Sequence, residues 1–229
     1  MKDLCAYTKN VDMANSTLLT LLNRSSALPG FGLLDGPPGV GKTTATIRLL
    51  NSIPNGIYIR AVRLETTSTF LDQLLKELGE RDIPRAKRAR LDKAVDALSQ
   101  NPRVLFIDEA DYYMGQPDIL ETIRDIQDLT DCTIMLIGMN KIAKKIATIP
   151  QLDSRIRQRY EFQPADLEDL QIIVETLFEE GIKVGDTLLR KVIRDTGGNL
   201  RNAAAMLEEI EKQAIVSGLD FIDMEHWQR

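Results

Sequence analysis

The chain has 229 residues, of which 43% are hydrophobic and 28% are charged. This length suits one large domain or a domain with a smaller companion, and the composition is that of an ordinary globular protein. The net charge of −5 argues against a uniformly basic nucleic-acid binder, although a local basic groove is compatible with it.

Targeting and redox features are sparse. No apolar run has the length of a membrane span, and the N-terminus lacks the apolar core of a signal peptide, so we expect no membrane association. Cys5 and Cys132 lie far apart in the sequence, which favours reduced, structural thiols and a cytoplasmic protein. His226 is the only histidine, and this disfavours histidine-based metal or triad chemistry.

A glycine-rich motif follows the first predicted elements. Leucines at helical spacing predict a short amphipathic helix before Pro29, and an apolar strand is expected at residues 30–35. The motif that comes next fits G-x-x-x-x-G-K-[ST], the phosphate-binding loop. Its glycines let backbone N–H groups turn toward phosphate oxygens, and a helix over residues 44–50 would direct its N-terminus at them. The predicted nucleotide-binding residues are Gly36, Pro37, Pro38, Gly39, Val40, Gly41, Lys42, Thr43 and Thr44.

Two residues of this motif have specific chemical roles. Lys42 places a positive charge on the β- and γ-phosphates of a nucleotide, and the Thr43 hydroxyl suits a Mg²⁺ ion. The motif therefore predicts ATP and Mg²⁺ as cofactors. The alternative is a glycine-rich turn that matches the motif by accident.

A second strand is predicted at residues 57–62, followed by two helices. Thr66, Thr67 and Ser68 are suited to cap a helix over residues 69–78. Pro84 precedes a longer helix over residues 85–99, which begins with a basic cluster. The members of this cluster are Arg85, Lys87, Arg88 and Arg90.

Two later strands end in polar residues. The apolar residues 104–107 run into Asp108 and Glu109, a pattern expected of a central parallel strand buried on both faces. A helix is predicted at residues 117–128, and the strand at 133–138 brings Asn140 just past its end. Strands that alternate with helices predict a parallel α/β sheet, whose ligands bind at the carboxyl ends of the strands.

These polar residues suit phosphoryl transfer to water. Asp108 is predicted to hold Mg²⁺, through a water molecule, and Glu109 to orient or activate the attacking water. Asn140 is predicted to polarise the γ-phosphate or the water. The alternatives are a solvated acidic turn at residues 108–111 and, for Asn140, the N-cap of a helix over residues 140–148.

The pattern changes after Pro164. Helices are predicted at residues 165–180, 186–195 and 199–217, and no strand is expected there. We therefore predict an α/β nucleotide-binding domain at residues 1–164 and a small all-helical lid domain at residues 165–229.

This combination resembles the AAA+ ATPases. The resemblance implies a parallel β-sheet core flanked by helices and a small C-terminal helical lid. It also implies that Asn140 is the residue called sensor 1 and that Arg201, in Gly197–Ala203, is the sensor 2 arginine. Asn10 and Val11 occupy the place where family members hold the adenine base.

The resemblance further implies an arginine finger, which acts on the nucleotide of an adjacent subunit. Arg155 is favoured for this role over Arg157. Hydrolysis would then require self-association. For each of these arginines the alternative is a surface or interface ion pair.

Within the family, the size of the chain and residues 7–11 resemble the phage Mu transposition protein B and the TnsC-type transposition regulators. This implies ATP-dependent assembly on duplex DNA without sequence preference, stimulation of a transposase, and disassembly driven by hydrolysis. The chain lacks room for an N-terminal helix-turn-helix domain, which leaves the ATPase core to contact DNA. The resemblance and the helix chemistry point to these contacts: Thr67, Ser68, Thr69, Arg85, Lys87, Arg88 and Arg90.

Several alternatives stay open. The basic cluster is equally compatible with a solvated helix face, and a second group at Lys141, Lys144 and Lys145 is interpreted as a helix face rather than a groove. One alternative function is that of replication initiators or loaders, which usually add a C-terminal DNA-binding domain. Secretion-associated ATPases are another alternative, and these continue into membrane and cell-wall-binding parts. A third is a scaffold whose assembly ATP controls with little hydrolysis. The sequence does not separate a filament from a closed ring.

Overall fold

The computed structural model describes residues 2, 5–179 and 181–227. The chain divides into two compact units. Unit 2 comprises residues 14–35 and 46–161, and unit 1 comprises residues 1–13, 36–45 and 162–229. The predicted boundary at residue 164 lies close to the point where the chain last enters unit 1. The phosphate loop and the N-terminal segment group with the C-terminal part, which the sequence pattern does not indicate.

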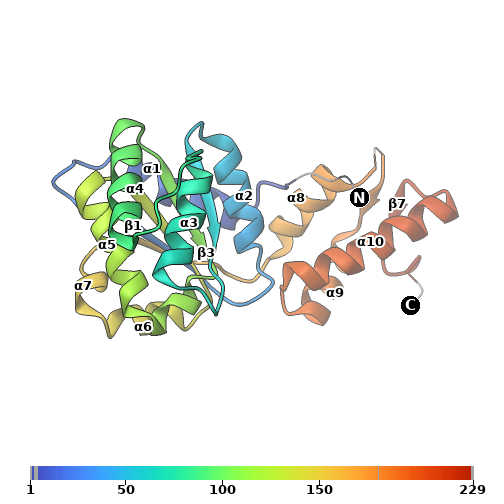
Figure 1. Ribbon diagram of the computed structural model, residues 1–229. Helices are drawn as coiled ribbons and strands as arrows, with labels where there is room; N and C mark the ends of the chain where they lie inside the picture. Colours follow the sequence, from blue (N-terminus) through green and yellow to red (C-terminus); the bar gives the residue numbers. More distant parts are fainter. Residues whose placement is uncertain (1, 3–4, 180, 228–229) are drawn as a thin grey trace. The chain divides into compact units, whose positions relative to one another are not determined.

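Unit 2 is built on a five-stranded parallel sheet of order β2-β3-β4-β1-β5 (Figure 1). The strands are β1 (Phe31–Asp35), β2 (Gly56–Arg60), β3 (Val104–Asp108), β4 (Thr133–Ile137) and β5 (Ile156–Glu161). β1, β3 and β4 are buried along their whole length, as the apolar runs predict. The predicted parallel α/β sheet is confirmed.

The edge strand β5 was not predicted from the sequence. Its side chains alternate between half-buried and exposed positions, and its exposed positions are Arg157, Arg159 and Glu161. An edge strand with one solvated face needs no apolar run. Its pairing with β1, set by tertiary contacts, defines it as a strand.

Helices cover both faces of the sheet. The helices are α1 (Lys9–Leu22), α2 (Lys42–Ser52), α3 (Thr67–Glu77), α4 (Lys87–Gln100), α5 (Pro117–Thr130), α6 (Ile142–Ala147) and α7 (Pro150–Asp153), with a 3₁₀-helix η1 (Ala110–Gly115) after β3. Phe70 and Leu74 of α3, together with Ile123 of α5, belong to the core cluster on one face. On the other face Leu21 of α1 packs against Gly32 of β1.

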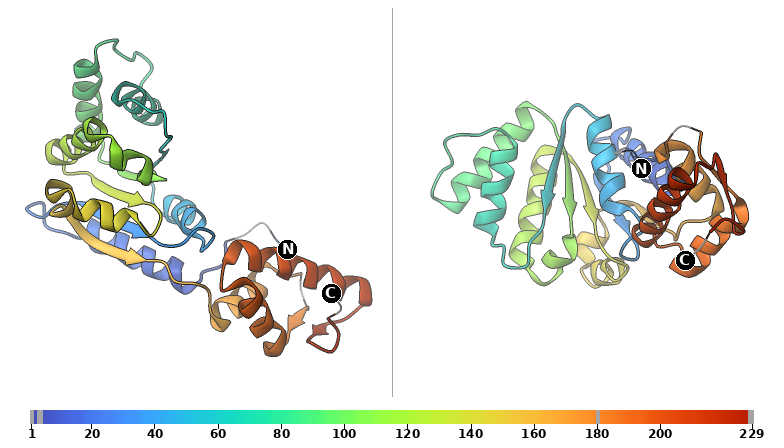
Figure 2. Two further views of the ribbon diagram at one scale, coloured as in Figure 1. Left: turned by 90° about the horizontal axis from the view of Figure 1, so that it is seen from below. Right: turned by 90° about the vertical axis from the view of Figure 1, so that its right-hand side faces the viewer.

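Unit 1 is mostly helical. Its helices are α8 (Leu167–Leu177), α9 (Asp186–Thr196) and α10 (Leu200–Ser217), drawn in orange and red (Figure 2). The expectation of no strand in this part is wrong, because β6 (Lys183–Val184) pairs in parallel with β7 (Phe221–Ile222). Each of these strands has two residues, too short for a periodic pattern.

The N-terminal segment belongs to the core of unit 1. Ala6 packs into its apolar cluster, and Lys9 pairs with Asp166 and with Glu168 at 2.9 Å. α1 therefore begins at Lys9, well before the leucines that predicted it. Among the described helices, none combines the length and the apolar character needed to cross a bilayer.

Candidate nucleotide-binding site

The phosphate loop in unit 1 has the backbone conformation that its glycines allow. Gly36, Gly39 and Gly41 have φ angles of 146°, 83° and 91°. At Gly39 a side chain would also overlap that of Asn199. Two constraints, backbone angle and space, thus require glycine at position 39.

Lys42 and Thr43 stand at the start of α2, directly after the loop. The Lys42 ammonium donates to the carbonyl oxygens of Gly36, at 2.8 Å, and Pro37, at 2.7 Å. The ammonium group is therefore held against the loop, where it would interact with the phosphate oxygens of a bound nucleotide. A lysine, a helix N-terminus and the exposed residue Thr43 fit a nucleoside triphosphate with its Mg²⁺.

The helical part of unit 1 holds this loop directly. The Asn199 side chain donates to the Pro38 carbonyl at 3.0 Å, and the Arg201 backbone N–H donates to the Gly39 carbonyl at 3.1 Å. Asn199 is also the N-cap of α10, because its side chain accepts from the backbone of Asn202 at 3.2 Å. The predicted sensor Arg201 therefore lies in the first turn of a helix bonded to the phosphate loop, with an exposed side chain.

Asn10 and Val11, predicted to lie at the adenine base, are both buried. The Asn10 side chain accepts from the backbone N–H of Gln163 at 3.0 Å and donates to its carbonyl at 2.8 Å. The Asn10 amide thus pairs with the Gln163 backbone in the way that a neighbouring β-strand would. It joins the N-terminal segment to the chain that leads into α8, a structural role that the sequence pattern does not reveal.

In unit 2, Asp108 ends β3 as a buried carboxylate, 4% exposed. It accepts hydrogen bonds from the Tyr58 hydroxyl and from the Glu109 backbone N–H, both at 2.8 Å. Burial, with the hydrogen bond to Asp108, raises the pKa of Tyr58 above its ordinary range, so Tyr58 stays a donor. A buried, oriented carboxylate at a strand end does not fit the alternative of a solvated acidic turn.

Glu109 has a left-handed backbone, with a φ of 57°. Such a conformation is unfavourable for a side chain of this kind and concentrates at functional sites. Its carboxylate lies 3.8 Å from the Arg60 guanidinium, which belongs to the neighbouring strand β2. Asp108 and Glu109 thus present separate carboxylates at the same edge of the sheet.

Asn140 follows β4, at the same edge, and is exposed. Lys141, not Asn140, holds the N-cap position of α6 and makes no side-chain cap bond, so the alternative role of Asn140 as a helix cap is wrong. The turn is held instead by Asp111, whose carboxylate accepts from the Met139 N–H at 2.6 Å. Sequence reasoning missed this role, because the partner is a backbone group in the segment that follows another strand.

The two arginine-finger candidates differ in their surroundings. The Arg155 guanidinium binds both carboxylate oxygens of Asp128, at 3.0 and 2.6 Å, and the Gln151 carbonyl at 2.8 Å. This hydrogen bonding to Asp128 raises the pKa of Arg155 further. Arg157 is exposed on β5, and it has no ion-pair partner within the described residues.

The predicted DNA contacts at the start of α3 are largely engaged. α3 begins at Thr67, two residues earlier than predicted, because Thr66 is its N-cap and forms a capping box with Thr69. Thr67 is buried. The Ser68 carbonyl accepts from Arg90 at 3.1 Å. The three predicted residues serve mainly to start α3 and to bind α4.

The basic cluster at the start of α4 is partly neutralised. Arg90 is largely buried and binds Asp72 at 3.2 Å and the Pro84 carbonyl at 2.6 Å. Arg88 pairs with Asp92 at 2.8 Å. α4 begins at Lys87 rather than at Arg85, and both of these side chains are exposed.

The described residues form no metal site made only of protein ligands. Among the described residues no group of three or more histidine, cysteine or acidic side chains is placed to hold a metal ion. Mg²⁺ that accompanies a nucleotide needs only one or two protein oxygens beside phosphates and water. Thr43 and Asp108 are the hard oxygen donors predicted for it.

Comparison with known proteins gives one family match. The family model described as AAA domain matches residues 26–146, from before β1 into α6. A potential ATP-binding protein of Staphylococcus aureus is 30% identical over 129 residues, 53% of this chain and 47% of that protein. The general secretion pathway protein A of Aeromonas hydrophila is 29% identical over 161 residues, 63% of this chain and 29% of that protein. The chain thus spans less than half the length of these relatives.

Solved structures share the fold at low identity. The Aeropyrum pernix ORC2 protein matches with a TM-score of 0.73 and 16% identity, over 97% of this chain and 66% of that one. The Aeropyrum pernix ORC1 protein, solved in complex with DNA, gives 0.65 and 19%, over 99% and 64%. Domain III of the Thermotoga maritima replication initiation protein DnaA gives 0.59 and 17%, over 95% and 89%. At such identities the likeness establishes the fold alone.

Proposed function

The chain belongs to the AAA domain family of P-loop ATPases, and we propose that it binds and hydrolyses ATP to control its own assembly on duplex DNA. One observation carries the nucleotide part of this proposal. The phosphate loop is bonded to the start of α10 through Asn199 and the Arg201 backbone. A nucleotide on the loop would therefore act directly on the lid helices.

The proposed roles of the site residues follow from their chemistry. The loop amides and Lys42 bind the phosphates, while Thr43 and Asp108 serve Mg²⁺, which neutralises charge that develops on the phosphates. Glu109 orients the attacking water as a general base, and Asn140 holds the γ-phosphate or that water. Arg201, in the same unit as the phosphate loop, is proposed to reach the same phosphates from the lid.

The proposed action between subunits depends on an arginine. Arg155 was favoured from the sequence, yet its guanidinium is held by Asp128, whereas Arg157 is exposed. Both remain candidates. Replacing the finger by alanine should abolish hydrolysis and leave ATP binding intact. Asp128→Ala is the matched control for Arg155→Ala, because it breaks the same ion pair without removing the arginine.

DNA is proposed as the partner of the assembly, in a role like that of replication initiators or loaders. This choice is supported by the structures with a similar fold, of which one was solved in complex with DNA and another belongs to a replication initiation protein. A transposition regulator that stimulates a transposase is a narrower form of the same proposal. The result that would support this narrower proposal is stimulation of a transposase by the ATP-bound assembly.

Electron microscopy with a slowly hydrolysed ATP analogue, with and without duplex DNA, tests this proposal. We expect ordered assemblies on DNA that require the analogue, and we expect Lys42→Ala to lose both ATP binding and assembly. Filaments would favour the transposition regulators, and closed rings the initiators. A wild-type chain that takes up no ATP, or a Lys42→Ala variant that still assembles on DNA, would overturn the proposal. Negligible ATP hydrolysis in the presence of DNA would indicate that the protein is a scaffold rather than an ATPase.

A further inference from the structure

Three loops of unit 2 form one continuous edge. β2, β3 and β4 are neighbouring parallel strands, so the segments that follow them lie side by side at the carboxyl edge of the sheet. Two contacts join these segments. Glu65, after β2, accepts from Tyr113 of η1, and Asp111 of η1 accepts from Met139 after β4.

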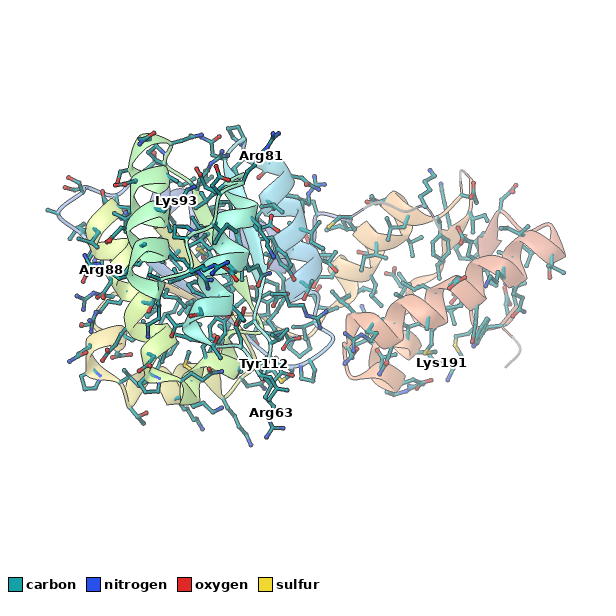
Figure 3. The ribbon with its side chains drawn as sticks, in the orientation of Figure 1. Arg63, Arg81, Arg88, Lys93, Tyr112 and Lys191 are labelled. Carbon is teal, nitrogen blue, oxygen red and sulfur yellow. The ribbon has the colours of Figure 1, made fainter. Side chains whose placement is uncertain are left out.

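This edge exposes a group of basic and apolar side chains beside the polar Asn140. Figure 3 shows Arg63 and Tyr112 at one end of unit 2, the end at which α6 lies in Figure 1. We name this set the carboxyl-edge surface. It consists of Arg63, Leu64, Tyr112, Met139, Lys141, Lys144 and Lys145, all exposed.

Positive charge on this surface is not compensated. Residues 132–152 contain three lysines and no acidic residue. Within the described part of the chain, neither Arg63 nor any of these lysines has an ion-pair partner. The acids of this edge have other partners: Glu65 and Asp108 are buried and hydrogen-bonded, Asp111 binds a backbone N–H, and Glu109 faces Arg60 at 3.8 Å.

The Arg63 turn is held in place before any partner binds. The Glu65 N–H donates to the Val62 carbonyl at 3.1 Å, which closes a four-residue turn with Arg63 and Leu64 at its tip. Glu65 is 7% exposed, and the fully buried Tyr113 donates to it. Leu64 projects from this turn and is 92% exposed. A fixed turn presents its arginine without the ordering cost of a flexible loop.

On this ground we propose that the carboxyl-edge surface binds the phosphate backbone of duplex DNA. Affinity for such a backbone comes from cations that displace condensed counterions, and a cation already paired with a carboxylate contributes little. On α4, Arg88 pairs with Asp92 and Lys93 with Glu80, and both side chains lie away from Arg63 and Tyr112 in Figure 3. This inference rests on the proposed function, which makes DNA the partner, and it moves the principal contact from the predicted α3 and α4 residues to α6 and the β2–α3 turn.

The test compares two double variants that each remove two positive charges. Lys144→Ala with Lys145→Ala alters the carboxyl-edge surface, and Arg85→Ala with Lys87→Ala alters the start of α4. Binding of a fluorescent duplex is titrated by anisotropy at several salt concentrations, with a slowly hydrolysed ATP analogue present. ATP binding is measured separately for each protein.

Loss of two phosphate contacts should weaken binding by up to about 60-fold at 0.1 M salt and lower the salt slope by about 2. We expect this of the Lys144/Lys145 variant, equally for unrelated duplex sequences, with ATP binding unchanged. Lys144→Arg with Lys145→Arg should keep wild-type affinity, because the charge is retained. The Arg85/Lys87 variant should stay near the wild type.

Three outcomes overturn the inference. Wild-type DNA affinity and salt slope in the Lys144/Lys145 variant would assign the surface to another partner, such as an acidic protein, and leave the proposed function standing. Loss of affinity only in the Arg85/Lys87 variant would place the contact on α4. A wild-type chain that binds ATP but no DNA would remove this inference together with the DNA part of the proposed function.

Discussion

Asp111 connects the ends of two neighbouring strands through a single hydrogen bond. Its carboxylate accepts from Met139 and fills the space beside Gly138, where a side chain would come within 2.5 Å of the same oxygen. Asn140 follows immediately. On the proposed function, Asp111 is a positioning residue for Asn140.

We expect Asp111→Ala to lower kcat for ATP hydrolysis by about tenfold to a hundredfold while ATP affinity is unchanged, because the displaced group acts only during reaction. Asn140→Ala should show the same split, and the double variant should be no worse than either single one. Asp111→Asn retains an acceptor oxygen and should restore most of the rate. Additive losses in the double variant would show that Asp111 does not act through Asn140.

Cys132 makes stability depend on pH in the alkaline range. Burial raises the pKa of this thiol from 9.0 to about 11, so the folded state favours the neutral thiol. The stabilisation is complete below about pH 9, where the thiol is neutral in both states, and is lost as the pH rises toward 11. The pKa difference corresponds to about 3 kcal/mol.

Denaturant unfolding at pH 8, 9, 10 and 11 should show this loss in the wild type. Cys132→Ala should flatten that part of the curve, apart from the contribution of tyrosines at the upper end. Identical pH slopes in the two proteins would contradict the assignment.

Arg90 joins helix α4 to α3, two elements that were both predicted from the sequence. It is largely buried, donates hydrogen bonds to the Ser68 and Pro84 carbonyls, and forms an ion pair with Asp72. Arg90→Ala should therefore lower the free energy of unfolding by about 2–4 kcal/mol, since it also leaves a partly buried carboxylate without its cation.

Chemical denaturation of Arg90→Ala and Arg85→Ala measures this difference. Arg85 is exposed and its replacement should change stability by less than about 0.5 kcal/mol. If Arg90→Ala were as stable as the wild type, the structural role of this arginine would be refuted.

The long elements of the sheet were predictable because buried strands and helices need apolar residues at regular positions in the sequence. The apolar runs of β1, β3 and β4 and the amphipathic helices around them appear in the sequence at nearly their observed bounds. β5, η1 and the β6–β7 pair were not predicted. They are short or carry alternating charges, and their pairing comes from tertiary contacts that a local pattern does not contain.

The candidate site was predictable to a similar extent. Glycines in a fixed motif and acids directly after an apolar strand indicated the phosphate loop, Asp108 and Glu109. The partners of Asn10, Arg90 and Asp111 were not indicated, because Gln163, Asp72 and Met139 lie far away in sequence. Which arginines are neutralised depends on such partners, so the sequence did not indicate that Arg88 and Arg90 of the predicted DNA contacts form ion pairs.

At the scale of the whole molecule, unit 1 is built from three segments that are separate in the sequence. Asn10 is 3% exposed and makes two hydrogen bonds to Gln163, which join the N-terminal segment to the lid. Asn10→Ala should destabilise unit 1 by about 2 kcal/mol and leave unit 2 nearly unchanged.

Hydrogen exchange followed by mass spectrometry separates the two units. Amides of α8 and α10 should exchange faster in Asn10→Ala, whereas those of β3 and β4 keep wild-type protection. Asn101→Ala, at an exposed position in unit 2, is the matched control. Equal acceleration in β3 and α10 would mean that the units do not unfold separately.

The discontinuity of unit 1 has a consequence for biosynthesis. The segment at residues 5–13 and the phosphate loop leave the ribosome long before residues 162–227, against which they pack. Domains generally fold as units during translation. The phosphate loop of a nascent chain therefore lacks its packing partners until the C-terminal residues 162–227 have been synthesised. Chains released before that point would expose the loop to chaperones and proteases.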